Sequence, residues 1–540
     1  MGGINLKFDP LYHRYSSKRN LIYGKNGMVA SSHPLAAQAG IDIMKKGGNA
    51  IDAAIATASA LTVVEPTSNG IGGDAFALVW TNGKLHGLNS SGPSPNSLTY
   101  EKLKESGLNS MPVYGFTPVT IPGVPAAWAE LSRRFGKLSL KEALAPAISL
   151  AKYGHPIAPT VAKYWNRAYE IFSEKLTGEE FKYWFETFAP NGRAPKPGEI
   201  WASPNHATTL EEIANTEAES FYKGNLAAMI DEFSRKFGGY ITKEDLEQYS
   251  PEWVEPIKVN YKGYDVWEIP PNGHGIVALM ALNILNNFEF KEKDSVETYH
   301  ILMEAMKLAF VDGHEYIGDP RYMKVTVEEL LSPEYGRERA RLISKSALLP
   351  EKGQPSKGGT VYFAAADGEG NMVSYIQSNY MGFGSGLVVP GTGIALHNRG
   401  NNFNMIENHP NCVGPEKKPY HTIIPGFLSK DGKAVGPFGV MGGFMQPQGH
   451  VQVVTSTIDF NLNPQDSLDA PRWQWLKDKT ISVEQTFSNS IALALAQKGH
   501  DIVAQVDSGS FGRGQIIWRD EDGVLCGGTE SRTDGYIAVF

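Results

Sequence analysis

Cysteine is scarce in this chain, which has only Cys412 and Cys526 among its 540 residues. Two thiols are too few for a disulfide scaffold or for a metal site built from several cysteines. The two residues could form one disulfide, but no pattern in the sequence requires it. Such low cysteine usage is typical of proteins from a reducing compartment.

Long apolar runs and a basic excess are also missing. No uninterrupted apolar stretch reaches the ~18 residues of a membrane-spanning helix. Residues 1–24 contain no apolar segment of signal-peptide length, and Asp9 and Pro10 interrupt them early. Lys and Arg total 50 against 58 Asp and Glu, so the net charge is −8, which disfavours a nucleic-acid partner. We therefore expect a cytoplasmic protein with neither a nucleic-acid nor a membrane partner.

What is present is an ordinary globular composition, 41% hydrophobic and 20% charged. Two segments rich in Ala, Ile and Leu, 35–46 and 50–64, predict packed helices separated by a glycine turn. An apolar run at 76–80 predicts a buried strand. The same patterns predict a helix at 298–311 and strands at 261–269, 423–428 and 516–518.

The sharpest change in composition lies at 345–359, which is polar and rich in Pro and Gly and therefore predicts an exposed loop. Two expected strands follow it, 360–366 and 372–377, joined by the turn sequence DGEGN. Thr360 thus opens an apolar strand directly after Gly358-Gly359.

This layout suits one chemistry. If the Gly359–Thr360 bond is cut, Thr360 gains a free α-amine beside its own hydroxyl, and that amine can act as the general base for the hydroxyl. An α-amine has a pKa of about 7.7–8, close to working pH. The alternative is that Gly-Gly-Thr is a plain turn that enters a strand.

Longer motifs favour the first interpretation. They are the segment 27–76, the segment 299–320, the region from Thr360 to Gly386, and VMGGFMQPQGH at 440–450. Through them the chain resembles the γ-glutamyltransferase (glutathione hydrolase) family of self-cleaving N-terminal nucleophile hydrolases. It is most similar to the signal-less branch that contains glutaryl-cephalosporin acylase-like proteins.

The resemblance implies an α+β fold, a four-layer αββα sandwich in one integrated domain. It also implies autocleavage into a large subunit, residues 1–359, and a small subunit, residues 360–540. Thr360 would be the nucleophile, and Ser378 stands where the family has a threonine that hydrogen-bonds it. Gly442 and Gly443 would offer N–H groups to an oxyanion, or they form a simple strand-to-helix turn.

Departures from the family pattern indicate a different acyl group. Asn402 occupies the position of the carboxylate that holds a substrate ammonium, and Arg399 replaces a neighbouring glutamine. The family's arginine for the glutamyl carboxylate has no counterpart in GLNSSGPSP at 87–95. A guanidinium suits a carboxylate and repels an ammonium, so we expect a glutaryl-type acyl group without an α-amine. Alternatively, Arg399 pairs with a structural acid such as Glu407.

Three further residues are candidates for substrate binding. His421 and Thr422 replace two family serines, and Tyr380 replaces an asparagine. Thr422 keeps a hydroxyl, Tyr380 could close the pocket with its ring, and His421 either binds the acyl carboxylate or packs. The segment between Phe403 and Gly414 is shorter than the lid of many relatives, which indicates a more open leaving-group side.

No cofactor or metal is expected. Gly70-x-Gly72-Gly73 lacks the third glycine of a dinucleotide loop, and His300 with Glu304 supplies only two potential metal ligands. The expected partners are a small γ-glutamyl- or glutaryl-type amide and water or an amine acceptor. Two alternatives stay open: a true glutathione hydrolase or γ-glutamyl transferase, and a non-catalytic binding scaffold, since Tyr362 and Ile376 depart from the family.

Overall fold

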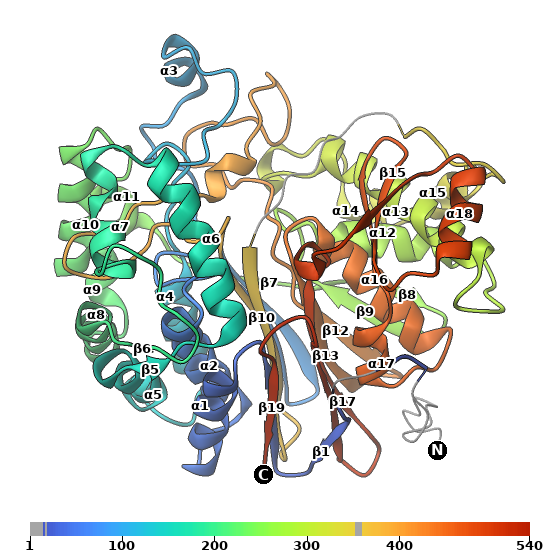
Figure 1. The fold of residues 1–540 in the computed structure, drawn as a ribbon, viewed down its shortest axis with the longest axis horizontal. Coiled ribbons are helices and arrows are strands. Elements are labelled where there is room, and N and C mark those ends of the chain that lie inside the picture. The colour runs from blue at the N-terminus through green and yellow to red at the C-terminus, as the bar shows by residue number, and fades with distance from the viewer. Residues whose placement is uncertain (1–13, 17–18, 351–358) are drawn as a thin grey trace.

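The computed structural model describes residues 14–16, 19–350 and 359–540 (Figure 1). It has a mixed α/β fold built around two seven-stranded sheets, in which every neighbouring pair of strands is antiparallel. None of the helices in the described part of the chain is both long and apolar enough to cross a membrane. Residues 351–358 of the loop expected at 345–359, and the segments 1–13 and 17–18, lie outside the described residues.

The first sheet carries the expected nucleophile strand near its centre. In spatial order its strands are β19 (Tyr536–Val539), β2 (Gly27–Ser31), β10 (Gly359–Asp367), β11 (Met372–Tyr380), β3 (Asp74–Thr81), β4 (Lys84–Ser90) and β7 (Glu252–Val254). The predicted strands at 76–80, 360–366 and 372–377 are confirmed, each with small extensions. The turn at DGEGN joins β10 to β11, as predicted.

The second sheet faces the first. Its order is β1 (Ile22–Gly24), β18 (Leu525–Thr529), β17 (Arg513–Arg519), β13 (Lys433–Met441), β12 (Gly426–Lys430), β9 (Tyr264–Glu268) and β8 (Ile257–Tyr261). Phe427 of β12 stacks on Trp80 of β3 with ring centroids 5.7 Å apart, so apolar side chains fill the space between the sheets. The strand predicted at 261–269 is instead the second half of a hairpin that turns at Lys262-Gly263, and β12 begins three residues later than predicted.

Helices cover the outer faces of both sheets (Figure 1). On one side lie α1 (Pro34–Lys45), α2 (Ala50–Val64), α4 (Val124–Phe135) and α5 (Leu140–Tyr153). On the other lie α12 (Gly275–Leu285), α13 (Val296–Tyr316) and α16 (Met445–Ile458). The predicted helices at 35–46, 50–64 and 298–311 are confirmed within one or two residues or inside a longer helix. Every residue of α2 and of α12 is buried, because each helix packs between a sheet and further helices.

Candidate active site

Thr360 is the second residue of β10 and is 1% exposed. A register irregularity between Gly359 and Val361 places it opposite Ser378 of β11, and the two hydroxyl oxygens lie 3.2 Å apart. The side-chain amide of Gln446 donates a hydrogen bond to the Thr360 Oγ1 at 3.4 Å. The structure thus brings the expected nucleophile and its expected partner together.

Ser378 also organises the end of its own strand. Its Oγ accepts the backbone N–H of Tyr380 at 2.7 Å, which is a local serine turn of the kind that competes with regular strand structure. Tyr380 adopts a positive φ of 72°, which is uncommon for a residue with a side chain. The turn directs the Tyr380 ring beneath Arg399, whose Cζ is 4.5 Å from the ring centroid.

Gly442 and Gly443 form the link between β13 and α16. Their φ angles are 138° and 59°, which favour glycine, and a Cβ on Gly442 would lie 3.0 Å from the Cα of Gly512. The first turn of α16 adjoins the nucleophile, because Gln446 contacts Thr360 and also accepts the Ile424 N–H at 3.0 Å. The N-terminus of a 14-residue helix therefore faces this region with its positive dipole end.

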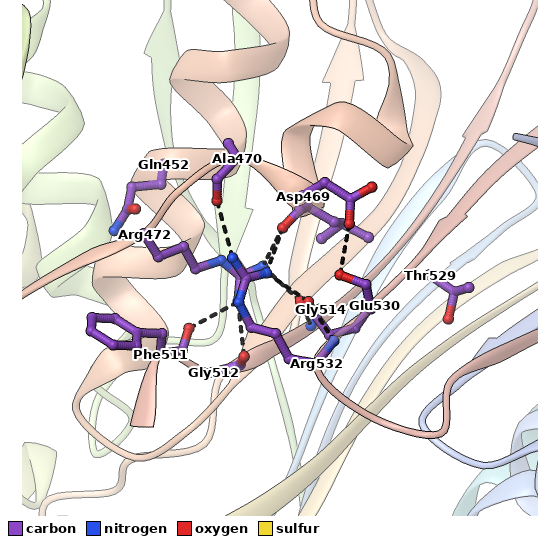
Figure 2. A network of polar contacts seen from close by, with 12 residues as sticks. Gln452, Asp469, Ala470, Arg472, Phe511, Gly512, Gly514, Thr529, Glu530 and Arg532 are labelled. Atoms are coloured by element: carbon purple, nitrogen blue, oxygen red, sulfur yellow. Dashed lines mark hydrogen bonds and ion pairs between the residues drawn. The ribbon is translucent and has the colours of Figure 1, made fainter. Parts of the chain in front are cut away.

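A buried ionic network supports the strand that lies behind this turn (Figure 2). Arg472 donates hydrogen bonds to the carbonyl oxygens of Phe511 and Gly512 at 2.8 and 2.9 Å, and it pairs with Glu530 at 2.8 Å. Glu530 also accepts the N–H of Gly514 at 2.9 Å. Since Gly512 lies against Gly442, the network fixes the wall behind the expected oxyanion site. Sequence reasoning did not identify this network.

Arg399 is fully buried in a short 3-10 turn, Arg399–Asn402. Its Nη1 donates to Thr422 Oγ1 at 2.7 Å, and its Nε lies 3.6 Å from Asp74 Oδ2. Burial lowers the pKa of Arg399 to about 10, and Asp74 opposes this shift. The alternative, that Arg399 pairs with a structural acid, is confirmed in kind, because the buried Asp74 lies 3.6 Å away. The example given, Glu407, is wrong, since Glu407 lies at the surface and contacts Lys104 at 3.5 Å.

Asp74 is another residue at the site that sequence reasoning missed. Its Oδ2 accepts a hydrogen bond from His421 Nε2 at 2.8 Å and lies 3.3 Å from His397 Nδ1. Burial raises the pKa of Asp74 to about 7, while Arg399 acts in the opposite direction. An acid placed directly after Gly72-Gly73 at the start of an apolar strand was the available signal.

The other expected substrate residues take definite places. His421 has a pKa well below its usual value because of burial, and it packs its ring 4.7 Å from that of Phe76 while it bonds Asp74. Asn402 is half-buried and brings no charge, and its Nδ2 has no hydrogen-bond partner among residues 14–16, 19–350 and 359–540. The segment after Phe403 packs by Phe403 and Val413 against Leu98 and Leu103.

His300 and Glu304 meet a third potential ligand, His500, within 4.8 Å. Lys307 occupies this cluster, because its ammonium donates to Glu304 at 2.7 Å and to His500 at 3.3 Å. A bound cation would therefore sit beside an existing positive charge. The cluster instead holds the segment that ends at residue 350, through hydrogen bonds to Ser344 O and to the backbone of Leu348.

Comparisons with known proteins agree with this geometry. The sequence profile of the family described as Gamma-glutamyltranspeptidase matches residues 36–540. This chain belongs to the γ-glutamyltranspeptidase family. It is 62% identical to a cephalosporin acylase from Bacillus halodurans of known crystal structure, with 99% of each chain covered and a TM-score of 0.95.

Two further relatives support the same family assignment. The chain is 35% identical to the glutathione hydrolase-like YwrD proenzyme of Bacillus subtilis over 95% of this chain and 98% of that one. It is 32% identical to the oxamate amidohydrolase proenzyme of Klebsiella pneumoniae over 95% and 98%. The chain is thus an autoprocessing amide hydrolase of this family.

The departures at Tyr362 and Ile376 lie in the core, where Tyr362 bonds Ser374 at 2.9 Å, so they do not argue for a non-catalytic scaffold.

Proposed function

We propose that this chain cuts itself between Gly359 and Thr360 and then hydrolyses glutaryl-type amides through an acyl-enzyme on Thr360. The observation that carries the proposal is the contact of the Thr360 hydroxyl with Ser378 at 3.2 Å, close to the first turn of α16. The fragments would be residues 1–359 and 360–540. Both sheets contain strands from both sides of the cut, which supports one integrated domain and a four-layer αββα sandwich.

The cut would proceed by attack of Thr360 Oγ on the carbonyl carbon of Gly359. The C–N bond then breaks, the acyl group moves from nitrogen to oxygen as an ester, and the nitrogen takes up the proton as an amine. Water hydrolyses the ester and releases the carboxylate of Gly359. The product is a Thr360 that carries a free α-amine next to its hydroxyl.

Turnover would use the same hydroxyl. The α-amine accepts the Oγ proton as Oγ attacks the substrate carbonyl, and the resulting oxyanion receives hydrogen bonds from the N–H groups of Gly442 and Gly443. The ammonium then gives the proton to the departing amine, which leaves the acyl ester. Water, or an amine acceptor, attacks the ester in the second half of the reaction, and Thr360 regains its proton.

The acyl specificity rests on Arg399. Its Nη2 is buried and has no hydrogen-bond partner among the described residues, and it is available to a carboxylate of the substrate. Asn402 offers no charge to a substrate ammonium. Thr422 accepts a hydrogen bond from Nη1, which restricts rotation of the guanidinium and leaves Nη2 available. An acyl group that has a distal carboxylate and no α-amine therefore fits Arg399 and Asn402.

A second candidate is γ-glutamyl hydrolysis or transfer, as in a glutathione hydrolase. The observation in its favour is Asp74, a buried carboxylate 3.6 Å from Arg399 that supplies the negative charge Asn402 lacks. Relatives of this chain carry the names of both activities, since glutathione hydrolase proenzymes and an acylase proenzyme match it at 32% and 30% identity. Substrate preference therefore decides between the two.

Two measurements test the proposal. N-terminal sequencing of the smaller fragment should begin at Thr360, and intact mass should give pieces of 359 and 181 residues, since 540 − 359 = 181. Glutaryl- and γ-glutamyl-p-nitroanilide, assayed side by side, should show a higher kcat/KM for the glutaryl compound. A preference for the γ-glutamyl compound would contradict the assigned roles of Arg399 and Asn402.

A further inference from the structure

Asp74 lies in line with the nucleophile across three neighbouring strands. In the register of β3 and β11 it is directly opposite Ser378, and Ser378 contacts Thr360 on β10. Directly paired residues on neighbouring antiparallel strands project to the same face of a sheet. The Asp74 carboxylate therefore belongs to the same face of the first sheet as the reacting hydroxyl.

Three basic side chains lie close to one oxygen of the Asp74 carboxylate. His421 Nε2 is 2.8 Å from Oδ2, His397 Nδ1 is 3.3 Å away and Arg399 Nε is 3.6 Å away. All four side chains are completely buried. These basic groups come from segments far from β3 in sequence, so the carboxylate ties the 397–399 segment and His421 to the first sheet.

Asp74 and two other residues together fix the orientation of Arg399. Asp74 faces its Nε edge, Thr422 accepts from Nη1 at 2.7 Å, and Tyr380 lies under the guanidinium plane. Nη2 has no hydrogen-bond partner among the described residues, and Nε makes no hydrogen bond there but forms an ion pair with Asp74 at 3.6 Å. A planar guanidinium that is contacted at Nε, at Nη1 and on one face cannot rotate, so its Nη2 group points in one direction.

We propose that Asp74 is a positioning residue that sets acyl specificity by holding Arg399 with its Nη2 corner toward the carboxylate of the acyl group. This inference rests on the proposed role of Arg399. It assigns to Asp74 no contact with the substrate. The competing role is a seat for a substrate ammonium at Oδ1, which has no hydrogen-bond partner among the described residues. It is disfavoured because the adjacent Arg399 repels a cation.

The test compares Asp74→Asn with the wild-type chain on two substrates. Glutaryl-p-nitroanilide carries the distal carboxylate, and pentanoyl-p-nitroanilide has the same chain length with a methyl group in its place. We expect KM for the glutaryl compound to rise roughly 10- to 100-fold, as for loss of a hydrogen bond to a charged group, with kcat nearly unchanged. Both constants for the pentanoyl compound should stay within about twofold.

Glu268→Gln is the matched control. Glu268 is another fully buried acid that bonds a histidine, His450, at 2.6 Å. Its removal should leave the ratio of the two KM values unchanged. If Asp74→Asn fails to mature, Asp74→Glu, which keeps the charge but moves it by one methylene, should still raise the glutaryl KM several-fold over the pentanoyl KM.

Other outcomes overturn the inference. An unchanged ratio, an equal loss on both substrates, or failure of both Asp74 variants to mature would remove the positioning role. A selective loss of γ-glutamyl-p-nitroanilide turnover would make Asp74 the ammonium seat instead. Arg399→Gln distinguishes failure of the Asp74 inference from failure of the proposed function. If Arg399→Gln still prefers the glutaryl compound, Arg399 does not bind the acyl carboxylate, whatever the result for Asp74.

Discussion

The hydroxyl oxygens of Thr360 and Ser378 lie 3.2 Å apart across β10 and β11, and the same Ser378 oxygen accepts the Tyr380 N–H at 2.7 Å. Because the Tyr380 N–H occupies one lone pair of that oxygen, the Ser378 proton is directed away from the Tyr380 amide. Ser378 thus connects the nucleophile to the turn that carries the Tyr380 ring beneath Arg399. One serine couples the reacting atom to the groups expected to bind the acyl chain.

Replacement of Thr360 by alanine should give an uncut and inactive chain, because both self-cleavage and turnover use its hydroxyl. Denaturing gels should show a single full-length band, and Thr360→Ser should still yield two fragments. Thr392→Ala is a suitable control, since Thr392 is also buried and its hydroxyl bonds the nearby backbone of Val389 and Ile394. Two fragments and amide turnover from Thr360→Ala would refute the proposed nucleophile.

Replacement of Ser378 by alanine should lower kcat by roughly 10- to 100-fold, because a hydrogen bond to the reacting hydroxyl is worth about 1.5–3 kcal/mol as charge develops. The effect should be similar for glutaryl and pentanoyl anilides, since Ser378 does not contact the acyl carboxylate. Ser374→Ala is the matched control on the same strand, because Ser374 bonds Tyr362 in the core. A change in Ser374→Ala as large as that in Ser378→Ala would argue against a specific role.

The periodic parts of the fold could be predicted from the sequence, and the nucleophile region could be located. Apolar patterns bounded by Gly and Pro identified α1, α2, β10 and β11 closely, because local burial determines them. The strand expected at 261–269 covers β9 and the turn before it, whereas β8 was not predicted. The turn between β8 and β9 uses Lys262 and Gly263 at φ of 47° and 90°, and Lys-Gly is a weaker turn signal than Asn-Gly.

The surroundings of Arg399 could not be predicted in the same way. Asp74 and His421, which meet at 2.8 Å, are 347 residues apart in the sequence. An acid close in sequence, Glu407, was the natural alternative partner, yet the chain turns that residue to the surface. Contacts of such sequence separation depend on sheet order and register, which no local pattern encodes.

Arg472→Met should destabilise the protein and lower kcat for every acyl group alike. The change leaves Glu530 with one fewer buried partner and frees the Phe511 and Gly512 carbonyls, and breaking a buried ion pair costs about 3–5 kcal/mol. Urea unfolding and steady-state kinetics measure the two effects. Arg337→Met removes an exposed pair with Glu334 and should cost less than about 1 kcal/mol. If kcat stays unchanged while stability falls, the network does not position the oxyanion turn.

Acid should destabilise the protein in part through His500, whose pKa burial lowers to about 3, with Lys307 acting in the same direction. Between the ordinary pKa of about 6.5 and that value, the unfolded chain binds a proton that the folded chain does not. The free energy of unfolding must therefore fall as pH decreases from 7 toward 4, by up to about 1.4 kcal/mol per pH unit for this group. His500→Gln keeps a donor and an acceptor for His300 and Lys307 but does not titrate, so urea unfolding at several pH values should show a shallower slope. His86→Gln, at a half-buried position, should change the slope less. An identical slope in wild type and His500→Gln would mean that His500 takes up its proton in the folded state as readily as in the unfolded chain.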